Sequence, residues 1–313
     1  MTDLMTRVAW MYYKQEKTQQ EIADRLGLSR IKVLRLLKEA REIGIVHIEI
    51  RTSHTNLLVM EEKLRDIFSL NDVVLIEEIN EEEVPYHGLA AATASYLQDF
   101  LKDGMLVGIG MCRTLYLTAQ YVAPDSKIDC TFISLTGGLT QVPNGYENQN
   151  IILNIANAFS AKAIYMMAPF VVSNPSIKQA LQHEDTIQNI LDNAKRCDVA
   201  VTSLGSIDAQ SSIFQYTQSG ISDLQEIKAK GGKGDVLGRF FNENGQELDV
   251  ALRNRTIGIN IQDFLGIPTR IIVAGGALKR DAIMGALRGS IPTVLISDEH
   301  TAAWLLKKSQ EEN

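Results

Sequence analysis

Apolar residues recur at helical spacing through residues 4–41. Leu4, Val8 and Tyr12 form a stripe on one expected helix, and Ile22 and Leu26 form a stripe on a second. A third amphipathic stretch, rich in cations, follows after only a few residues. The pattern therefore predicts three short helices that pack their apolar faces together.

Helix-capping residues mark where the second and third helices begin. Thr18 and Glu21 have the spacing of a capping box, and Ser29 can cap the next helix. Between them, Gly27 can adopt a positive φ because it lacks the Cβ atom that makes this conformation costly. Two short helices joined by a glycine turn are typical of a helix-turn-helix, whose second helix lies in the DNA major groove.

A different pattern begins after the third helix. Residues 46–51 alternate apolar and polar positions, as a half-buried strand would, and could form a small wing or the exit from the DNA-binding head. Residues 52–57 are polar and turn-prone. We therefore predict a helix-turn-helix (winged-helix-like) domain over residues 1–51, a linker over 52–57 and a second domain over 58–313.

In the second domain, a helix over residues 57–68 is followed by short apolar runs that alternate with amphipathic stretches. The expected strands are residues 73–76, 106–109, 131–135, 163–166, 199–203, 269–273 and 293–297. The expected helices are residues 88–101, 113–122, 147–159, 175–194, 222–229 and 280–287. Strands that are apolar throughout predict a doubly wound α/β fold, in which helices cover both faces of a parallel sheet. Ligands of such sheets bind at the carboxyl ends of the strands.

Charge is distributed unevenly along the chain. Residues 1–51 contain ten Lys and Arg against seven Asp and Glu, a net +3, whereas the remainder contains 21 against 31, a net −10. Five cations and one anion lie between Ser29 and Arg41. A basic head on an acidic body reserves one surface for DNA phosphates. An ordinary solvated helix pair is the alternative, and it leaves the caps and the glycine turn unexplained.

Length and composition narrow the class of protein. At 313 residues, with 45% hydrophobic and 22% charged residues, the chain is long enough for two globular domains. It contains no apolar run of the roughly eighteen residues that a membrane span needs, and no secretion signal. The three cysteines are widely spaced and the five histidines form no metal motif. We therefore expect a cytoplasmic protein with no metal and no cofactor.

Glycine-rich loops follow four of the expected strands. They are residues 108–114 (GIGMCRT), 135–140 (LTGGLT), 203–208 (SLGSID) and 274–283 (AGGALKRDAI). Backbone N–H groups at glycines and at helix N-termini bind anions, and Lys279 adds a cation to the last loop. The expected ligand is a phosphate. The alternative is a set of sharp strand-to-helix turns with a solvated lysine.

Two further residues are candidates for the same site. Asp235 can accept hydrogen bonds from sugar hydroxyls, or it can be a turn residue. Arg255 can bind a phosphate in bidentate fashion, or it can form an ion pair. The sequence contains no P-loop, no dinucleotide-binding fingerprint and no nucleophile elbow.

The chain resembles the SorC family of bacterial transcription regulators. The head carries this resemblance through AWMYYKQEKTQQEIADRLGLSRIKVLRLLKEAREIGIVHIEI, and the body through GIGMCRT, LTGGLT, GDVLGRFFNENG, RNRTIGI and VAGGALKRDAIMGAL, in the family's order. The resemblance implies an effector domain similar to sugar-phosphate isomerases and a phosphorylated sugar or polyol as effector. It also implies control of a sugar or polyol catabolic operon by a homotetramer, a dimer of dimers.

The candidate residues fall into two groups. The residues expected to contact operator DNA are Thr18, Gln19, Gln20, Ser29, Arg30, Lys32, Val33 and Arg35. The residues expected at the effector are Gly108, Gly110, Met111, Arg113, Thr114, Thr136, Gly137, Gly138, Gly205, Asp235, Arg255, Gly275, Gly276 and Lys279. The resemblance places the phosphate cradle at Gly275, Gly276 and Lys279. It also places Thr136 where a relative has a Schiff-base lysine, so we expect reversible binding.

Two other functions fit part of the pattern. A sugar-phosphate isomerase or deaminase fused to a DNA-binding head would need a general base, and Asp235 is the candidate that the sequence offers. A constitutive architectural DNA binder would leave the glycine-rich loops unexplained. We therefore expect a regulator and not an enzyme.

Overall fold

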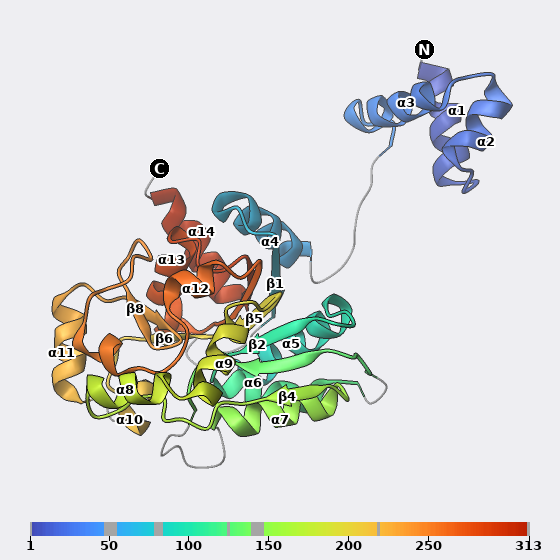
Figure 1. Ribbon diagram of the computed structural model, residues 1–313. Coiled ribbons are helices and arrows are strands. Elements are labelled where there is room, and N and C mark those ends of the chain that lie inside the picture. The colour runs from blue at the N-terminus through green and yellow to red at the C-terminus, as the bar shows by residue number, and fades with distance from the viewer. Residues whose placement is uncertain are drawn as a thin grey trace. The chain divides into compact units, whose positions relative to one another are not determined.

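The structure is a computed structural model and describes residues 2–46, 55–77, 84–123, 126–138, 147–217 and 220–311. The chain divides into two units, Met1–Thr55 and Asn56–Asn313 (Figure 1). Residues 47–54, which hold most of the expected wing strand and linker, lie outside the described residues. The exact limits predicted for the linker therefore stay a prediction.

Three helices form the first unit: α1 (Thr2–Tyr13), α2 (Gln19–Leu26) and α3 (Arg30–Glu42). Thr18 caps α2, because its hydroxyl accepts the N–H of Glu21 and its own N–H donates to the Glu21 carboxylate at 2.8 Å. Gly27 ends α2 with φ at 62°. The hydroxyl of Ser29 accepts the N–H of Lys32 and starts α3. The predicted capping box, glycine turn and second cap are thus confirmed.

One apolar cluster holds the three helices together. Val8, Ile22 and Val33, one from each helix, are completely buried, and Leu36 and Leu37 of α3 pack against them. Helices of this length are marginal alone in water, so the burial of these aliphatic side chains stabilises the unit. The outer face of α3 remains exposed to solvent.

Seven parallel strands form the central sheet of the second unit. They are β1 (Asp72–Ile76), β2 (Leu106–Ile109), β3 (Thr131–Ser134), β4 (Lys162–Ile164), β5 (Val199–Thr202), β9 (Thr269–Val273) and β10 (Val294–Asp298). Their spatial order is β1-β10-β9-β5-β2-β3-β4, and every adjacent pair is parallel. The predicted α/β fold with a parallel sheet is confirmed.

Alternate residues of each strand point to opposite faces of this sheet. Val199 and Val201 of β5 belong to an apolar core cluster on one face of the sheet. Helices α5 (Tyr86–Phe100), α6 (Arg113–Thr118) and α7 (Asn148–Ala158) cover this face. Ala200, between them, enters the cluster covered by α4 (Thr55–Phe68), α9 (Asp185–Ala194), α13 (Arg280–Arg288) and α14 (Glu299–Glu311) (Figure 1). Burial on both faces is why inner strands such as β5, in which all four residues are buried, are rich in apolar residues.

A second, antiparallel sheet was not predicted. Its strands are β6 (Leu204–Ser206), β7 (Gly234–Val236) and β8 (Arg239–Phe241), in the order β6-β7-β8. The turn between β7 and β8 consists of Leu237 and Gly238, with φ of 54° and 70°. Two residues with positive φ are typical of a type I′ hairpin turn. Strands of three residues are too short to show an alternating pattern, so this hairpin could not be predicted from the spacing of apolar residues.

The helix predicted over residues 175–194 is in fact two helices, α8 (Pro175–Gln182) and α9. Glu184, between them, has an extended ψ of 124°, and Asp185 places an acid in the favourable first turn of α9. No residue of α8 is buried, whereas Ile187 and Leu191 of α9 enter the core. The apolar spacing continues across the break, so the pattern could not reveal it.

The remaining elements are short. They are the helices α10 (Ser212–Tyr216), α11 (Ile221–Ala229) and α12 (Ile261–Leu265), and the 3₁₀ turns η1 (Ala119–Tyr121), η3 (Ala251–Arg255) and η4 (Ala277–Lys279). The turn η4 lies between β9 and α13. It therefore places Lys279 at the carboxyl end of the parallel sheet.

Candidate functional site

A pocket of about 220 Å³ opens where the parallel strands end. Its lining includes residues 111–114 after β2, Thr136 after β3, residues 203–206 after β5 and residues 278–279 after β9. The tip of the β7–β8 hairpin completes one side. All four glycine-rich loops thus contribute to one pocket, because parallel strands end at the same edge of a sheet.

Asp235, on β7, is the buried carboxylate of this pocket. It is 9% exposed, and its Oδ2 accepts the N–H of Gly238 at 3.0 Å. A Cβ atom on Gly205, its partner across the sheet, would lie 2.0 Å from Oδ1, so glycine makes room for the carboxylate. Burial raises the pKa of Asp235 to about 6, although the N–H of Gly238 and the charge of Lys279 act in the opposite sense.

Two cations line the same pocket. Lys279 Nζ donates to the hydroxyl of Ser203 at 3.0 Å, and burial lowers the pKa of this ammonium group. The guanidinium of Arg113 lies 4.4 Å from the ring centroid of Tyr86, which also lines the pocket. An anionic group in the pocket would therefore meet two positive charges, and the incompletely hydrated Lys279 gains most from it.

The hydroxyl of Thr136 is buried and has no hydrogen-bond partner among the described residues. Its backbone C=O, by contrast, accepts the side-chain amide of Asn148 at 3.2 Å. Buried hydroxyls in native proteins nearly always have a partner. Because Thr136 lines the pocket, its hydroxyl is a candidate contact for a ligand.

Six of the glycines expected at the effector do not line this pocket: Gly108, Gly110, Gly137, Gly138, Gly275 and Gly276. The N–H of Gly276 donates to Oδ2 of Asp298 at 2.8 Å, and those of Gly110, Gly137 and Gly138 donate to backbone carbonyls. A Cβ atom on Gly275 would lie 2.2 Å from Asp298. These glycines permit close packing of the loops, and the N–H of Gly276 already has its acceptor within the protein.

Arg255 also lies outside the pocket lining. Its Nη2 is 2.6 Å from Oδ1 of Asp223, and both side chains are largely buried. The structure therefore favours the ion-pair interpretation of this residue over the phosphate clamp. The remaining effector candidates, Met111, Thr114 and Gly205, line the pocket as expected.

Several pocket residues were missed by the sequence patterns. Ser203 directly follows β5, and Leu237 forms the hairpin tip with its positive φ. Asp208, which accepts a short hydrogen bond from Ser206, and residues 210–213 form the outer rim. Ser203 and Asp208 belong to the glycine-rich loop 203–208 that the sequence marked, although only Gly205 of that loop was named as a candidate. Leu237 carried no signal, because only the hairpin brings it there.

The first unit exposes Arg30, Lys32 and Arg35 on α3. Val33 is completely buried, so it supports the helix from within and does not face solvent, contrary to its expected place at the DNA surface. Nε of Arg35 lies 3.3 Å from Oε1 of Glu39, and the Arg35 side chain is 70% exposed. Surface pairs of this kind are weak, so the guanidinium can exchange this partner for a phosphate or a base.

Other candidate DNA contacts gather beside α3. Thr18, Gln19, Gln20 and Arg30 line one open pocket of about 700 Å³. The hydroxyls of Thr18 and Ser29 are engaged as helix caps.

Two apolar residues of α3 were missed as candidates. Ile31 and Leu34 are 79% and 53% exposed, although both are large aliphatic side chains. They stand three residues apart, and Arg35 and Lys38 continue the same helix face. Their apolar character made them look like core positions in the sequence.

Among the described residues, no helix is long and apolar enough to cross a membrane. No group of three or more His, Cys, Asp or Glu side chains in this part of the chain could hold a metal ion.

We predict that Asp235→Asn stabilises the free protein above about pH 7. The folded-state pKa of Asp235 lies above the ordinary value of 3.8, so wild type loses stability as pH rises from that value to about 6. Asparagine removes this loss and can still accept the N–H of Gly238. Urea unfolding should show a gain on the order of 1–3 kcal/mol near pH 7.5 that shrinks toward pH 4. Exposed Asp66→Asn is the control, and a gain independent of pH would contradict the assignment.

Comparison with known proteins identifies the family. The Sugar-bind family model, described as "Putative sugar-binding domain", matches residues 53–307. The chain is 31% identical to the erythritol catabolism regulatory protein EryD of Brucella abortus, over 97% of this chain and 96% of that protein. It is 30% identical to the deoxyribonucleoside regulator of Bacillus subtilis, over 97% of each.

A solved structure is similar over the same extent. The crystal structure of the full-length sorbitol operon regulator SorC from Klebsiella pneumoniae matches with a TM-score of 0.75 and 25% identity, covering 97% of this chain and 98% of that one. These relatives are named as regulators, in agreement with the expectation of a regulator and not an enzyme. The chain thus belongs to the SorC family of sugar-binding transcription regulators.

Proposed function

We propose that the protein controls an operon for the catabolism of a sugar or polyol, and that a phosphorylated sugar or polyol in the strand-end pocket changes its binding to operator DNA. The observation that carries this proposal is the composition of the pocket. Cations (Lys279 and Arg113) and hydrogen-bonding groups for hydroxyls (Asp235 and Thr136) line one small cavity. A phosphate monoester of a polyhydroxylated carbon chain matches both sets.

The two sets of groups have complementary roles in this proposal. Lys279 is expected to bind the phosphate, since a partly buried ammonium gains from a dianion. Asp235 is expected to accept hydrogen bonds from hydroxyls, and Thr136 supplies a hydroxyl without a described partner. The names of the relatives support this class of ligand, because they refer to erythritol, deoxyribonucleosides and sorbitol.

The head is proposed to bind DNA through α3. Arg30, Lys32 and Arg35 are exposed cations for phosphates or guanine, and the exposed Ile31 and Leu34 suit contact with thymine methyl groups in the major groove. Thr18, Gln19 and Gln20 lie at the start of α2, where they can help position the head on the DNA backbone.

Regulation requires that the effector bind two states of the protein unequally. A ligand with the same affinity for the DNA-bound and the released assembly would shift nothing. The usual coupling between two such sites is about 1–3 kcal/mol. One helix-turn-helix reads one half-site, so we propose that the protein self-associates, with a homotetramer as the state that the resemblance implies.

Lys279→Ala should abolish the response to effector while leaving folding and operator binding intact. The phosphate loses its nearest cation, whereas the head is unchanged. Thermal-shift screening with phosphorylated sugars and polyols identifies the effector, and fluorescence anisotropy then measures operator affinity with and without it. Lys307→Ala, which removes an exposed cation from α14, is the matched control. A normal effector response in Lys279→Ala would exclude this lysine from the site.

Lys32→Ala and Arg35→Ala should each weaken operator binding by about 1–3 kcal/mol if the side chain contacts a base. A contact to phosphate alone would weaken operator and unrelated duplex DNA equally and reduce the salt dependence. Arg7→Ala, which removes a cation from α1, is the control in the same head. Operator affinity that is unchanged in both α3 variants, measured at moderate salt, would reject this placement.

Ile31→Ala and Leu34→Ala should reduce affinity for operators that contain thymine at the contacted positions. The expected loss is about 0.8 kcal/mol for each methyl group that leaves an apolar contact. Operators in which deoxyuridine replaces thymidine lack these methyl groups, so wild type and variants should bind them alike. A loss of the same size on both kinds of operator would show that the two side chains act through the fold of the head.

A further inference from the structure

A second cavity, of about 530 Å³, lies in the same unit as the effector pocket. Its charged lining consists of Lys178 from α8, Lys195 after α9, Arg239 from β8, Arg253 from η3 and Asp263 from α12. The lining therefore carries four cations and one anion, although residues 52–313 as a whole have a net charge of −10. The cavity is therefore locally positive in a domain whose net charge is negative.

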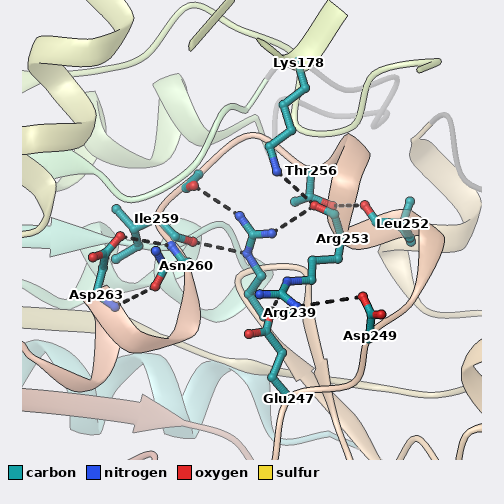
Figure 2. A network of polar contacts seen from close by, with 11 residues as sticks. Lys178, Arg239, Glu247, Asp249, Leu252, Arg253, Thr256, Ile259, Asn260 and Asp263 are labelled. Atoms are coloured by element: carbon teal, nitrogen blue, oxygen red, sulfur yellow. Dashed lines mark hydrogen bonds and ion pairs between the residues drawn. The ribbon is translucent and has the colours of Figure 1, made fainter. Parts of the chain in front are cut away.

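Two of the four lining cations already form ion pairs with carboxylates. Arg253 pairs with Glu247 at 3.2 Å, and Lys195 pairs with Asp192 at 2.9 Å. Asn260 caps α12: its side chain accepts the N–H of Asp263, and the Asp263 carboxylate accepts the N–H of Asn260 in return (Figure 2). Lys178 and Arg239 remain, since neither has a carboxylate within ion-pair distance in the part of the chain that the structure describes.

Arg239 is a buried cation held only by carbonyl groups. It is 3% exposed, and its guanidinium donates to the C=O groups of Arg253, Gly258 and Ile259 at 3.1–3.2 Å (Figure 2). Burial lowers the pKa even of this guanidinium. The carbonyl dipoles fix its position and orientation, and the nearby carboxylates of Glu247 and Asp263 offset part of the cost of burying its charge.

Lys178 and Arg239 share a hydrogen-bond acceptor in η3, the backbone carbonyl of Arg253. Nζ of Lys178 donates to this carbonyl at 3.0 Å (Figure 2). Burial, with Arg239 and Arg253 nearby, lowers the pKa of Lys178 to about 8, while Glu247 acts in the opposite sense. Two incompletely hydrated cations side by side are costly, and a bound anion removes that cost.

The cavity is separate from the effector pocket, although the two share a wall. Among the residues that the structure describes, none lines both. Gly238 faces the effector pocket and its neighbour Arg239 faces the second cavity. Likewise, Thr136 lines the first and Gly258 the second, and these two residues pair in an antiparallel bridge.

We propose that this cavity is a second anion-binding site, which takes a small multiply charged anion of the phosphate class. Lys178 and Arg239 supply the charge, and the side-chain amides of Gln182, Asn254 and Asn260 in the lining can donate further hydrogen bonds. The site does not depend on the proposed effector or on DNA binding.

The test uses the full-length protein and inorganic phosphate and pyrophosphate as probes. Isothermal titration at constant ionic strength should detect binding to wild type, and Lys178→Gln should lower the affinity at least about tenfold. Without phosphate, Lys178→Gln should melt at a higher temperature than wild type, because the repulsion from Arg239 is gone. Asn254→Asp, at an exposed lining position, should also weaken binding by adding a negative charge.

Two controls separate this site from the effector pocket. Lys279→Ala should retain phosphate binding at the second site, and Lys307→Gln should behave as wild type. The proposal is overturned if Lys178→Gln and Asn254→Asp bind phosphate as wild type does, or if Lys279→Ala alone removes all binding. It is equally overturned if sodium chloride at matched ionic strength stabilises the protein as much as phosphate does.

Discussion

Parallel strand pairing is the constraint on which the strand-end pocket depends. Because β2, β3, β5 and β9 run in one direction, the loops that follow them must all emerge at one edge. Residues as distant in sequence as Met111 and Lys279 line one pocket for this reason. The glycines of these loops let the backbone pack closely: a Cβ atom on Gly108 would lie 2.4 Å from Leu135, and one on Gly137 would lie 2.3 Å from the carbonyl oxygen of Pro169.

Burial in the pocket then shifts the pKa values of its ionisable side chains. It raises the pKa of Asp235 and lowers the pKa of Lys279, so both ionised forms are less favourable in the empty pocket than in water. A ligand that brings a phosphate and several hydroxyls replaces the lost hydration of both groups. The same arrangement costs stability without ligand, which is a common feature of binding sites.

The β7–β8 hairpin lies between the strand-end pocket and the second cavity. Its tip, Leu237 and Gly238, faces the first, while Arg239 is fixed by carbonyl groups beside the second. Both tip residues have positive φ, a conformation that a non-glycine residue such as Leu237 adopts only when the surrounding structure holds it there. A ligand that moves this turn would therefore act on backbone that both cavities share.

The sequence by itself determined the elements whose signals are local. Caps at Thr18 and Ser29, the left-handed Gly27 and the apolar strands depend on neighbouring residues, so their patterns are visible along the chain. The common location of the loops after the strands, at one edge of the sheet, followed from the rule for parallel sheets. Tertiary structure decided which of the candidate residues reach the pocket or the solvent and which serve packing instead. It buried Val33, exposed Ile31, paired Arg255 with Asp223 and used the N–H of Gly276 for Asp298. These outcomes depend on contacts between residues far apart in sequence, which no local spacing records.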